Sequence, residues 1–352
     1  MAVAVSEQAQ PEFPAAHSNE GSGSRRYRLH GLLLATETTF ATWPVVAGSE
    51  DTSLEDTWSL ALQPGDGVPD GPLPDSDDYR GKWSLVAGSG SAPEQVSYTV
   101  TGAEGGVESV FVVDLVKRVI GVSWAVHRPE TNDGVGFLLA SRVLPVAARL
   151  SRGALPLHAT AVEFQGRALV VCGESGVGKS TLTVGLLAAG GRLIGDEPIV
   201  LDLAANSVTA CQSSLLLRVH EGSPALNLLT DLGRVVVVSR DKVGGLPTAS
   251  ESIAVPPIPV AAVIVLGPRH GHTTALESVR ITGIDAVNAL LGQRYSGRGP
   301  VPVVTGDFAT AAAVVERTPV LRATLSDSID LLPQAVRDLL GVARPDRLDN
   351  AP

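Results

Sequence analysis

Residues 173–180 read Gly-Glu-Ser-Gly-Val-Gly-Lys-Ser, a complete GxxxxGK[ST] phosphate-binding loop (P-loop, or Walker A). The glycines let backbone N–H groups turn inward around a phosphate chain. Lys179 adds a point charge for the terminal phosphates, and the Ser180 hydroxyl can complete the oxygen shell of a Mg²⁺ ion. The stretch predicts a nucleotide site, but alone it leaves open whether the terminal phosphate is hydrolysed, transferred or sensed.

The sequence on both sides of this loop fits a strand–loop–helix unit. Residues 168–172 (Ala-Leu-Val-Val-Cys) form a short apolar run, as expected of a buried strand. Residues 181–189 predict a helix whose positive N-terminus faces the anion, and Gly190-Gly191 predicts its end. The residues predicted to bind the nucleotide are Gly173, Glu174, Ser175, Gly176, Val177, Gly178, Lys179, Ser180 and Thr181.

Composition narrows the classes of protein to consider. The 352 residues are 44% hydrophobic and 18% charged, which is typical of a globular protein large enough for two domains. A net charge of −10 argues against a nucleic-acid partner and against docking on an anionic membrane. Cys172 and Cys211 are too few for a disulfide scaffold. Because no signal peptide or membrane span is evident, we expect a soluble cytoplasmic protein.

Changes in pattern along the chain predict how it is divided. Short apolar segments broken by Gly, Pro and Asp indicate strands in the first half, and a change of period after residue 133 indicates a helix that Pro145 can kink. The predicted units are a disordered leader (1–25), a β-rich domain (26–132), a linking helix (133–152), a P-loop domain (153–345) and a tail (346–352). The expected N-terminal strands are 27–36, 95–101, 109–115 and 119–126, with a loop at 65–81.

Strand and helix patterns alternate in the second half, which predicts the α/β class. Gln165-Gly166 predicts a tight hairpin between two strands. The expected strands are 155–164, 167–172, 199–202, 215–219, 235–238, 260–266 and 320–325, and the expected helices are 284–293, 308–316 and 330–340.

Two adjacent acids follow the loop helix at the end of a short apolar run. Asp196 and Glu197 are placed as acids should be at the carboxyl end of a neighbouring strand, where ligands of α/β proteins collect. One acid can lie nearer a metal and the other nearer a nucleophile. An ordinary charged turn would show the same spacing.

Three further groups have weaker signals. His158 lies in an otherwise apolar strand, where a histidine is more often a satisfied core residue than a catalytic one. Arg218 and His220 could contact an acceptor or a γ-phosphate, but a solvated strand end explains them better. Residues 269–272 (Arg-His-Gly-His) have no third metal ligand nearby, so we interpret them as an exposed turn.

Three segments together resemble the catalytic core of HPr kinase/phosphorylase: residues 157–162 (Leu-His-Ala-Thr-Ala-Val), 173–180, and 191–197 (Gly-Arg-Leu-Ile-Gly-Asp-Glu). The resemblance is closer to the bacterial HPr-kinase-related serine kinases, some of which modify ribosomal peptides such as lasso peptides. It implies a P-loop domain of the HPr kinase C-terminal type with a smaller β-rich N-terminal domain.

The resemblance also implies a role for each matching residue. Lys179 would hold the β- and γ-phosphates of ATP, and Ser180 would bind Mg²⁺. Asp196 matches the base that activates a seryl hydroxyl, Glu197 the metal-side acid, and His158 the histidine beside the γ-phosphate. The implied activity is ATP-dependent transfer of phosphate to a hydroxyl, of serine in a peptide or protein or of a small molecule. A non-catalytic nucleotide-binding regulatory module is the remaining alternative.

Some positions depart from the family pattern. Glu197 stands where the family usually has Asp, and Thr181 stands where HPr kinase has Glu. The Gly/Arg/Asn-rich signature near the protein substrate of HPr kinase is also missing from the sequence. HPr itself is therefore not the expected acceptor, and a phosphorylase reaction is unsupported. The acceptor and the oligomeric state stay open, with a homo-oligomer among the options.

Overall fold

The computed structural model describes fifteen parts of the chain, and the statements below concern these residues. They are 25–37, 43–46, 57–64, 80–86, 94–101, 107–124, 131–204, 206–234, 236–239, 242–246, 248, 252–269, 271, 274–295 and 306–342. The predicted leader, apart from Arg25, lies outside them, as do the predicted tail, His270 and His272.

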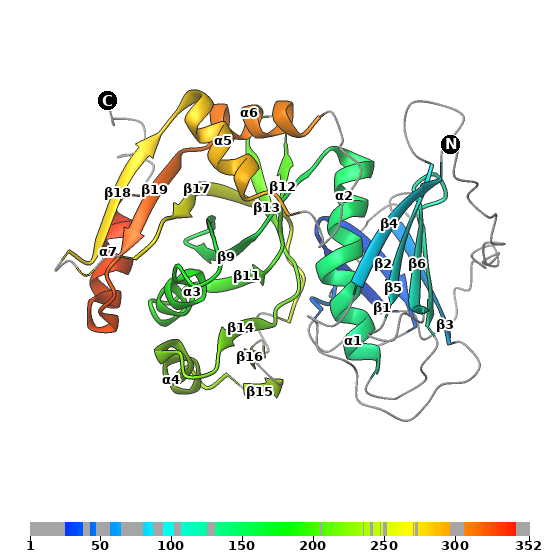
Figure 1. The fold of residues 1–352 in the computed structure, drawn as a ribbon, viewed down its shortest axis with the longest axis horizontal. Helices are drawn as coiled ribbons and strands as arrows, with labels where there is room; N and C mark the ends of the chain where they lie inside the picture. The colour runs from blue at the N-terminus through cyan, green and yellow to red at the C-terminus, as the bar shows by residue number, and fades with distance from the viewer. Residues whose placement is uncertain are drawn as a thin grey trace, which may run out of the picture.

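Within the described residues, seven strands of the first half pair into one sheet in the order β1-β2-β3-β7-β6-β5-β4 (Figure 1). In β5 the side chains alternate between buried and half-buried, so Val96, Tyr98 and Val100 face the core. The bounds are β1 (Arg25–Leu29), β2 (Leu32–Thr36), β3 (Thr57–Pro64), β4 (Arg80–Val86), β5 (Gln95–Thr101), β6 (Val107–Asp114) and β7 (Val119–Trp124).

The strands predicted for this half are partly confirmed. The strand at 95–101 is confirmed, whereas the single strand at 27–36 is wrong. The chain reverses at His30-Gly31, whose φ angles of 51° and 74° form a two-residue turn that brings Leu29 opposite Leu32. The predicted loop at 65–81 is wrong at its end, because β4 begins at Arg80.

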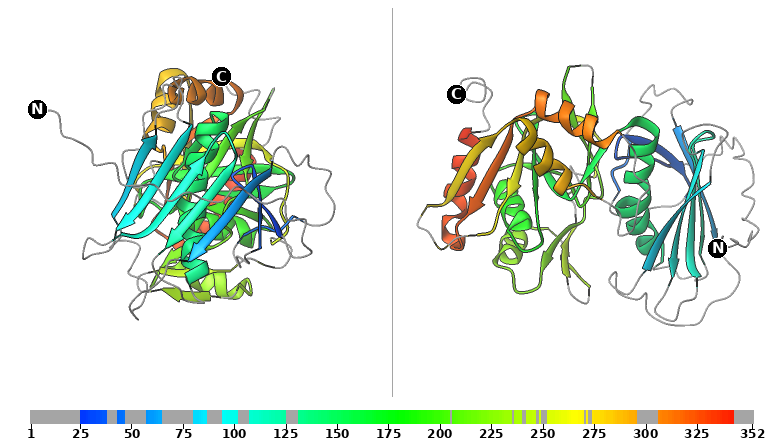
Figure 2. Two further views of the ribbon diagram at one scale, coloured as in Figure 1. Left: turned by 90° about the vertical axis from the view of Figure 1, so that its right-hand side faces the viewer. Right: turned by 45° about the horizontal axis from the view of Figure 1, so that its top comes forward.

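A helical segment links the two halves of the chain and lies between their sheets (Figures 1 and 2). It consists of α1 (Thr131–Leu138), a π-helical turn η2 (Leu139–Val143) and α2 (Leu144–Arg152). These residues are helical where the sequence predicts a linking helix at 133–152, but the irregularity is the π-helical turn rather than a kink at Pro145. Pro145 lies in the first turn of α2, where a missing N–H is tolerated.

A second sheet, of nine strands in the described residues, carries the phosphate loop. Its order is β11-β9-β10-β17-β13-β12-β8, with β19 added beside β17 and β18 beside β19. The strands β10, β17 and β19 run parallel. The bounds are β8 (Leu155–Leu157), β9 (Ala159–Phe164), β10 (Arg167–Gly173), β11 (Arg192–Asp196), β12 (Ile199–Leu203), β13 (Val208–Cys211), β17 (Ile258–Leu266), β18 (Leu276–Ile281) and β19 (Val320–Leu325).

The loop strand β10 is buried on both faces, which explains its unbroken apolar sequence. Leu169 and Val171 pack with α3 and α7, whereas Val170 and Cys172 pack with α5 and α6. The helix bounds are α3 (Lys179–Ala188), α5 (Gly283–Gly292), α6 (Asp307–Arg317) and α7 (Leu332–Val342), and a 3₁₀ turn, η3 (Ile329–Leu331), precedes α7.

A small sheet lies next to the loop helix. It contains β14 (Leu217–His220), β16 (Lys242–Gly245) and β15 (Val236–Ser239), accompanied by α4 (Pro224–Asp231). The start of α4 follows ordinary capping rules, since the Ser223 hydroxyl accepts the N–H of Ala225 and Pro224 occupies the first turn.

Of two predictions for the second half, one is confirmed and one is wrong. The hairpin at Gln165-Gly166 is confirmed, with φ angles of 54° and 77° between β9 and β10. The single strand predicted over 155–164 is wrong, because it breaks at His158. Its two parts pair with different neighbours: β8 pairs with β12, and β9 with β10 and β11. Among the helices of the described residues, none combines the length and apolar composition of a membrane span.

Candidate active site

The phosphate loop joins the end of β10 to the start of α3. Gly176 and Gly178 have φ angles of 87° and 113°, a left-handed conformation that side chains disfavour. Gly178 is also the N-cap of α3, so the first N–H groups of the helix point toward the loop. The local backbone therefore has the turn conformation that the sequence predicts for a phosphate-binding loop.

Lys179 is held within this loop. Its side chain is only 6% exposed, and its Nζ donates hydrogen bonds to the carbonyl oxygens of Gly173 at 2.8 Å and Glu174 at 3.2 Å. A carboxylate oxygen of Glu197 lies 3.4 Å from the same nitrogen. The ammonium group is therefore positioned at the loop, beside the acids.

Asp196 ends β11 and is 4% exposed. The preceding Gly195 has no room for a Cβ, because Ser213 lies against it. The Oδ2 atom of Asp196 accepts the backbone N–H of Arg218 at 2.9 Å. Burial, and then the neighbouring charge of Glu197, raise the pKa of Asp196 to about 7, although Arg218 and Lys179 act in the opposite direction.

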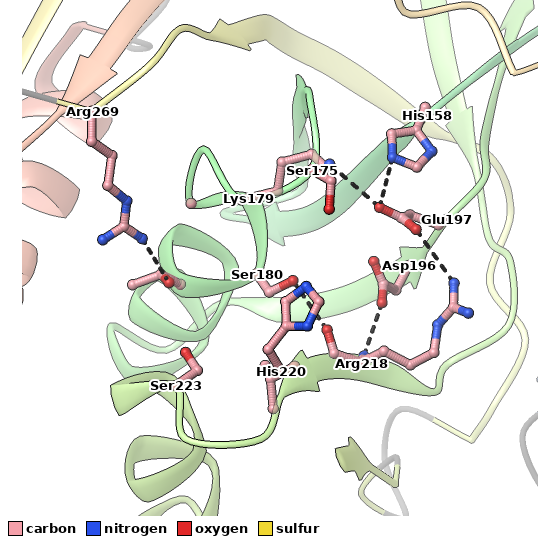
Figure 3. A pocket seen from close by; sticks show the side chains of 14 residues that line it. His158, Ser175, Lys179, Ser180, Asp196, Glu197, Arg218, His220, Ser223 and Arg269 are labelled. Carbon is pink, nitrogen blue, oxygen red and sulfur yellow. Dashed lines mark hydrogen bonds and ion pairs between the residues drawn. The ribbon is translucent and has the colours of Figure 1, made fainter. Parts of the chain in front are cut away.

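The Glu197 carboxylate is approached by the side chains of His158, Lys179 and Arg218 (Figure 3). It lies 3.1 Å from Nε2 of His158, 3.4 Å from Nζ of Lys179 and 3.4 Å from Nη2 of Arg218. These residues come from the bend before β9, the loop helix and β14. The carboxylate therefore joins segments far apart in the sequence.

His158 occupies the bend between β8 and β9, not the interior of a strand. Its backbone N–H donates to the carbonyl of Gln293 at 2.7 Å, and its ring stacks parallel to that of Tyr295 at 6.4 Å. The Tyr295 N–H donates to the carbonyl of Pro156 at 2.9 Å. With a side chain 35% exposed, His158 is not a core histidine.

Arg218 belongs to the site, which corrects its interpretation as a solvated strand end. Its side chain is 19% exposed and lies over the ring of Phe137 in α1, 4.9 Å from the ring centre. Its carbonyl oxygen accepts the hydroxyl hydrogen of Ser180 at 3.0 Å. The linking helical segment therefore contacts the site through Phe137. His220 ends the same strand, with an exposed side chain at the cavity.

One cavity of about 300 Å³ brings these groups together. It is lined by all the residues predicted to be catalytic or metal-binding: His158, Lys179, Ser180, Asp196 and Glu197. Of the predicted loop residues, Ser175, Gly176, Gly178 and Thr181 also line it, whereas Gly173, Glu174 and Val177 do not.

The side chains fit a magnesium-bound nucleotide. In the described part of the chain, no group of three or more His, Cys, Asp or Glu residues is placed to hold a metal ion. Mg²⁺ at nucleotide sites needs only one or two protein oxygens, because phosphate and water oxygens complete its shell. The Ser180 hydroxyl and the carboxylates of Asp196 and Glu197 are such oxygens in one cavity.

Sequence reasoning did not identify Phe137 or Tyr295 as contributors to the site, and its assignment of Arg269 to an exposed turn is wrong, because Arg269 is half-buried and lines the cavity. Arg269 follows β17 and donates to the carbonyl of Val177 at 3.3 Å and to Oγ1 of Thr181 at 3.1 Å. Its place just after the apolar run at 260–266 was an available signal, since β17 is the parallel neighbour of the loop strand.

No family model and no curated protein sequence matches this chain. Among solved structures, the HPr(Ser) kinase/phosphatase from Coxiella burnetii is similar, with a TM-score of 0.28 and 14% identity. The match covers 53% of this chain and 95% of that chain. This likeness is too weak to transfer any residue role. The structure itself is mixed α/β with several sheets.

Proposed function

We propose that this chain is an ATP-dependent phosphotransferase of the HPr-kinase-related type, which transfers the γ-phosphate to a hydroxyl group, that of serine in a peptide or protein. The supporting observation is that Lys179 and Ser180 of the phosphate loop share one cavity with Asp196, a buried carboxylate. A module that only senses nucleotide needs the loop but not the carboxylate, so this combination favours group transfer.

ATP would bind with its phosphates against the loop N–H groups and the start of α3. On binding, Lys179 exchanges its contacts with loop carbonyls and Glu197 for oxygens of the β- and γ-phosphates. Ser180 and the Glu197 carboxylate would hold Mg²⁺, which supplies neutralising charge to the phosphates when bound. Glu197 then remains close to His158 and Arg218.

In the transfer step, the acceptor oxygen forms a bond to the γ-phosphorus while the bond from that phosphorus to the β-phosphate bridging oxygen breaks. The hydroxyl proton passes to the Asp196 carboxylate, leaving ADP, a phosphate ester and a protonated Asp196. Asp196 is buried and lines the same cavity as the phosphate loop, so a carboxylate is positioned there to act as the general base. Arg218 and Lys179 offset negative charge on the transferring group.

The acceptor reaches the acid end of the cavity. His158 is partly exposed there, and His220 and Glu221 at the end of β14 are exposed. A side chain carried on a larger molecule can therefore approach Asp196 from solvent, which supports a peptide or protein acceptor.

The test is incubation with γ-labelled ATP, Mg²⁺ and the products of neighbouring genes, followed by mass spectrometry. We expect label on a hydroxyl side chain with the wild-type chain and none with Lys179→Ala. Label found only as free phosphate would contradict the proposal and indicate an ATPase or a sensor. Label on a metabolite would retain phosphotransfer but replace the acceptor class.

A further inference from the structure

One face of the linking helical segment is directed at the site. Phe137 and Arg142 lie five positions apart, so an uninterrupted α-helix would turn them about 140° away from each other. In η2 the Leu144 N–H donates to the carbonyl of Leu139, so this turn closes over five residues and brings residues five apart toward one face. Arg142 therefore lies on the same side as Phe137, which contacts the site through Arg218.

The π-helical turn has a cause in the sequence and a partner in the first half of the chain. Pro145 has no N–H to donate, and Ala140 lies five residues before it, so a turn of this width leaves the Ala140 carbonyl without a helical donor. Nε2 of His30, at the turn between β1 and β2, donates to that carbonyl at 2.7 Å. The seven-stranded sheet therefore supports the turn that carries Arg142.

Arg142 contacts Tyr295 both at its hydroxyl and over its ring. Nη1 of Arg142 donates to the Tyr295 hydroxyl, and the central carbon of its guanidinium lies 5.6 Å from the centre of the ring. Tyr295 is buried, and its backbone N–H donates to the carbonyl of Pro156 in β8 at 2.9 Å. The ring of Tyr295 is therefore fixed between the linking helical segment and the strand that leads to His158.

Tyr295 in turn bounds the imidazole ring of His158. The two rings are parallel to within 1°, with their centres 6.4 Å apart. His158 lies in the bend between β8 and β9, where its backbone N–H donates to the carbonyl of Gln293 at 2.7 Å. Its Nε2 lies 3.1 Å from the Glu197 carboxylate. The orientation that presents this nitrogen to the cavity therefore depends on the position of Tyr295.

His158 lies at the part of the cavity where the γ-phosphate of ATP belongs. In this class of loop the lysine reaches the β- and γ-phosphates. The Nζ atom of Lys179 lies 3.4 Å from the Glu197 carboxylate, which His158 also contacts, and Figure 3 shows these side chains together beside the loop. ADP has no phosphate at this position, so a contact of His158 distinguishes ATP from ADP.

We propose that Arg142 and Tyr295 are positioning residues for phosphate transfer: Arg142 fixes the ring of Tyr295, and that ring holds His158 against the γ-phosphate. The proposal rests on the proposed function, because it needs ATP bound in the loop, but it does not depend on the identity of the acceptor. Since His30 supports the turn that carries Arg142, the seven-stranded sheet acts on the γ-phosphate contact through this chain of side chains.

The measured quantity is the ratio of the dissociation constants of Mg·ADP and Mg·ATP, obtained by calorimetry, which reports the contacts of the γ-phosphate. We expect Tyr295→Leu to lower this ratio about tenfold, because a hydrogen bond to a charged group is lost, and to leave Mg·ADP affinity unchanged. Tyr295→Phe keeps the ring but not the hydroxyl, so it should match Arg142→Met, with a loss of about threefold in each. Tyr98→Leu, at a buried tyrosine that does not line the cavity, is the control and should keep the wild-type ratio.

A double-mutant cycle with His158→Gln separates positioning from packing. His158→Gln alone should lower the ratio about tenfold, and Tyr295→Leu added to it should lower the ratio no further, because Tyr295 acts through His158. An equal loss in both backgrounds, or a matching loss of Mg·ADP affinity, would overturn the proposal. Should Tyr295→Leu not fold, Arg142→Met completes the same cycle.

The outcomes also distinguish this proposal from the proposed function. Wild type that binds neither nucleotide refutes both. Wild type that transfers phosphate but shows no loss in Tyr295→Leu or Arg142→Met refutes the positioning role alone. Wild type that binds ATP no more tightly than ADP also overturns the positioning role, because His158 then makes no contact with the γ-phosphate.

Discussion

The seven-stranded sheet and the nine-stranded sheet bury different kinds of side chain. The core of the first contains large aromatic residues, among them Trp43, Tyr27 and Phe111. The core of the second is aliphatic, and buried polar groups such as Lys179 and Asp196 gather at the carboxyl ends of its strands. In the first region burial serves packing, whereas in the second it also shapes a site.

In the first region, the buried polar side chain of His30 is kept neutral. It is fully buried at the turn between β1 and β2, and its Nε2 donates to the carbonyl of Ala140 at 2.7 Å. Burial lowers the pKa of His30 to about 4, so the ring stays neutral near physiological pH. In contrast, Asp196 is buried among other charges, which is typical of functional sites.

The largest expected effect is on folding. Replacing Phe111 by Ala in the aromatic core should lower the free energy of unfolding by about 3–5 kcal/mol. Because Phe111 is remote from the cavity lining, ATP affinity of the folded protein should not change. Urea unfolding and calorimetric ATP titration check both points, with the exposed Val116→Ala as control. Weaker ATP binding by folded Phe111→Ala protein would contradict the claim that the aromatic core of the first region serves packing alone.

Next in size is the phosphate loop itself. Lys179→Ala removes the buried ammonium group and should weaken ATP binding about 100-fold, or about 2.7 kcal/mol. Because Lys117 is exposed in a turn of the first region, Lys117→Ala should bind ATP like wild type. Direct titration with Mg·ATP measures both variants. Unchanged affinity in Lys179→Ala would show that the loop does not bind nucleotide.

Asp196 should make stability depend on pH in the metal-free protein. Because its pKa rises from 3.8 to about 7 on folding, the folded state holds a proton that the unfolded state releases in this window. Its contribution to stability therefore falls as pH rises from about 4 to 7. Asp196→Asn lacks this loss, so its free energy of unfolding should exceed that of wild type by a few kcal/mol at pH 8.

Thermal unfolding at pH 5 and pH 8 checks the direction of this effect. The Tm advantage of Asp196→Asn should be larger at pH 8 than at pH 5. The exposed Asp231→Asn should show no such trend. An advantage that shrinks toward pH 8 would mean that Asp196 is not held with a raised pKa.

The smallest expected effect comes from a contact between the linking helical segment and the site. Phe137 in the linking helical segment packs against Arg218, so Phe137→Ala should loosen Arg218 and lower the rate of transfer about fivefold, equivalent to about 1 kcal/mol. Phe137→Tyr keeps the ring and should restore the rate. Steady-state kinetics with labelled ATP measures the rate of phosphate transfer in wild type and both variants. Equal rates in all three proteins would show that Phe137 has only a packing role.

Local signals allowed several features to be predicted. The phosphate loop and the Gln165-Gly166 hairpin depend on backbone conformations that glycine marks within a few residues. The strand at 320–325 was recognisable because its apolar run follows Pro319. These features are fixed by neighbouring residues in the sequence.

Other features depend on contacts between distant segments, so the sequence could not show them. The π-helical turn lies against the His30 turn, more than a hundred residues earlier. The break at His158 depends on the carbonyl of Gln293. Arg218 resembled a surface arginine because its partners, Phe137 and Glu197, lie 81 and 21 residues before it in the chain.

The most direct test of phosphotransfer is to measure ATP binding and phosphate transfer together in Asp196→Asn. The substitution keeps the shape and an oxygen that can accept the Arg218 N–H, but it removes the proton acceptor. We predict that ATP still binds with near wild-type affinity while transfer falls by roughly 10²–10⁴-fold. Transfer at the wild-type rate in Asp196→Asn would contradict the assignment of Asp196 as the base.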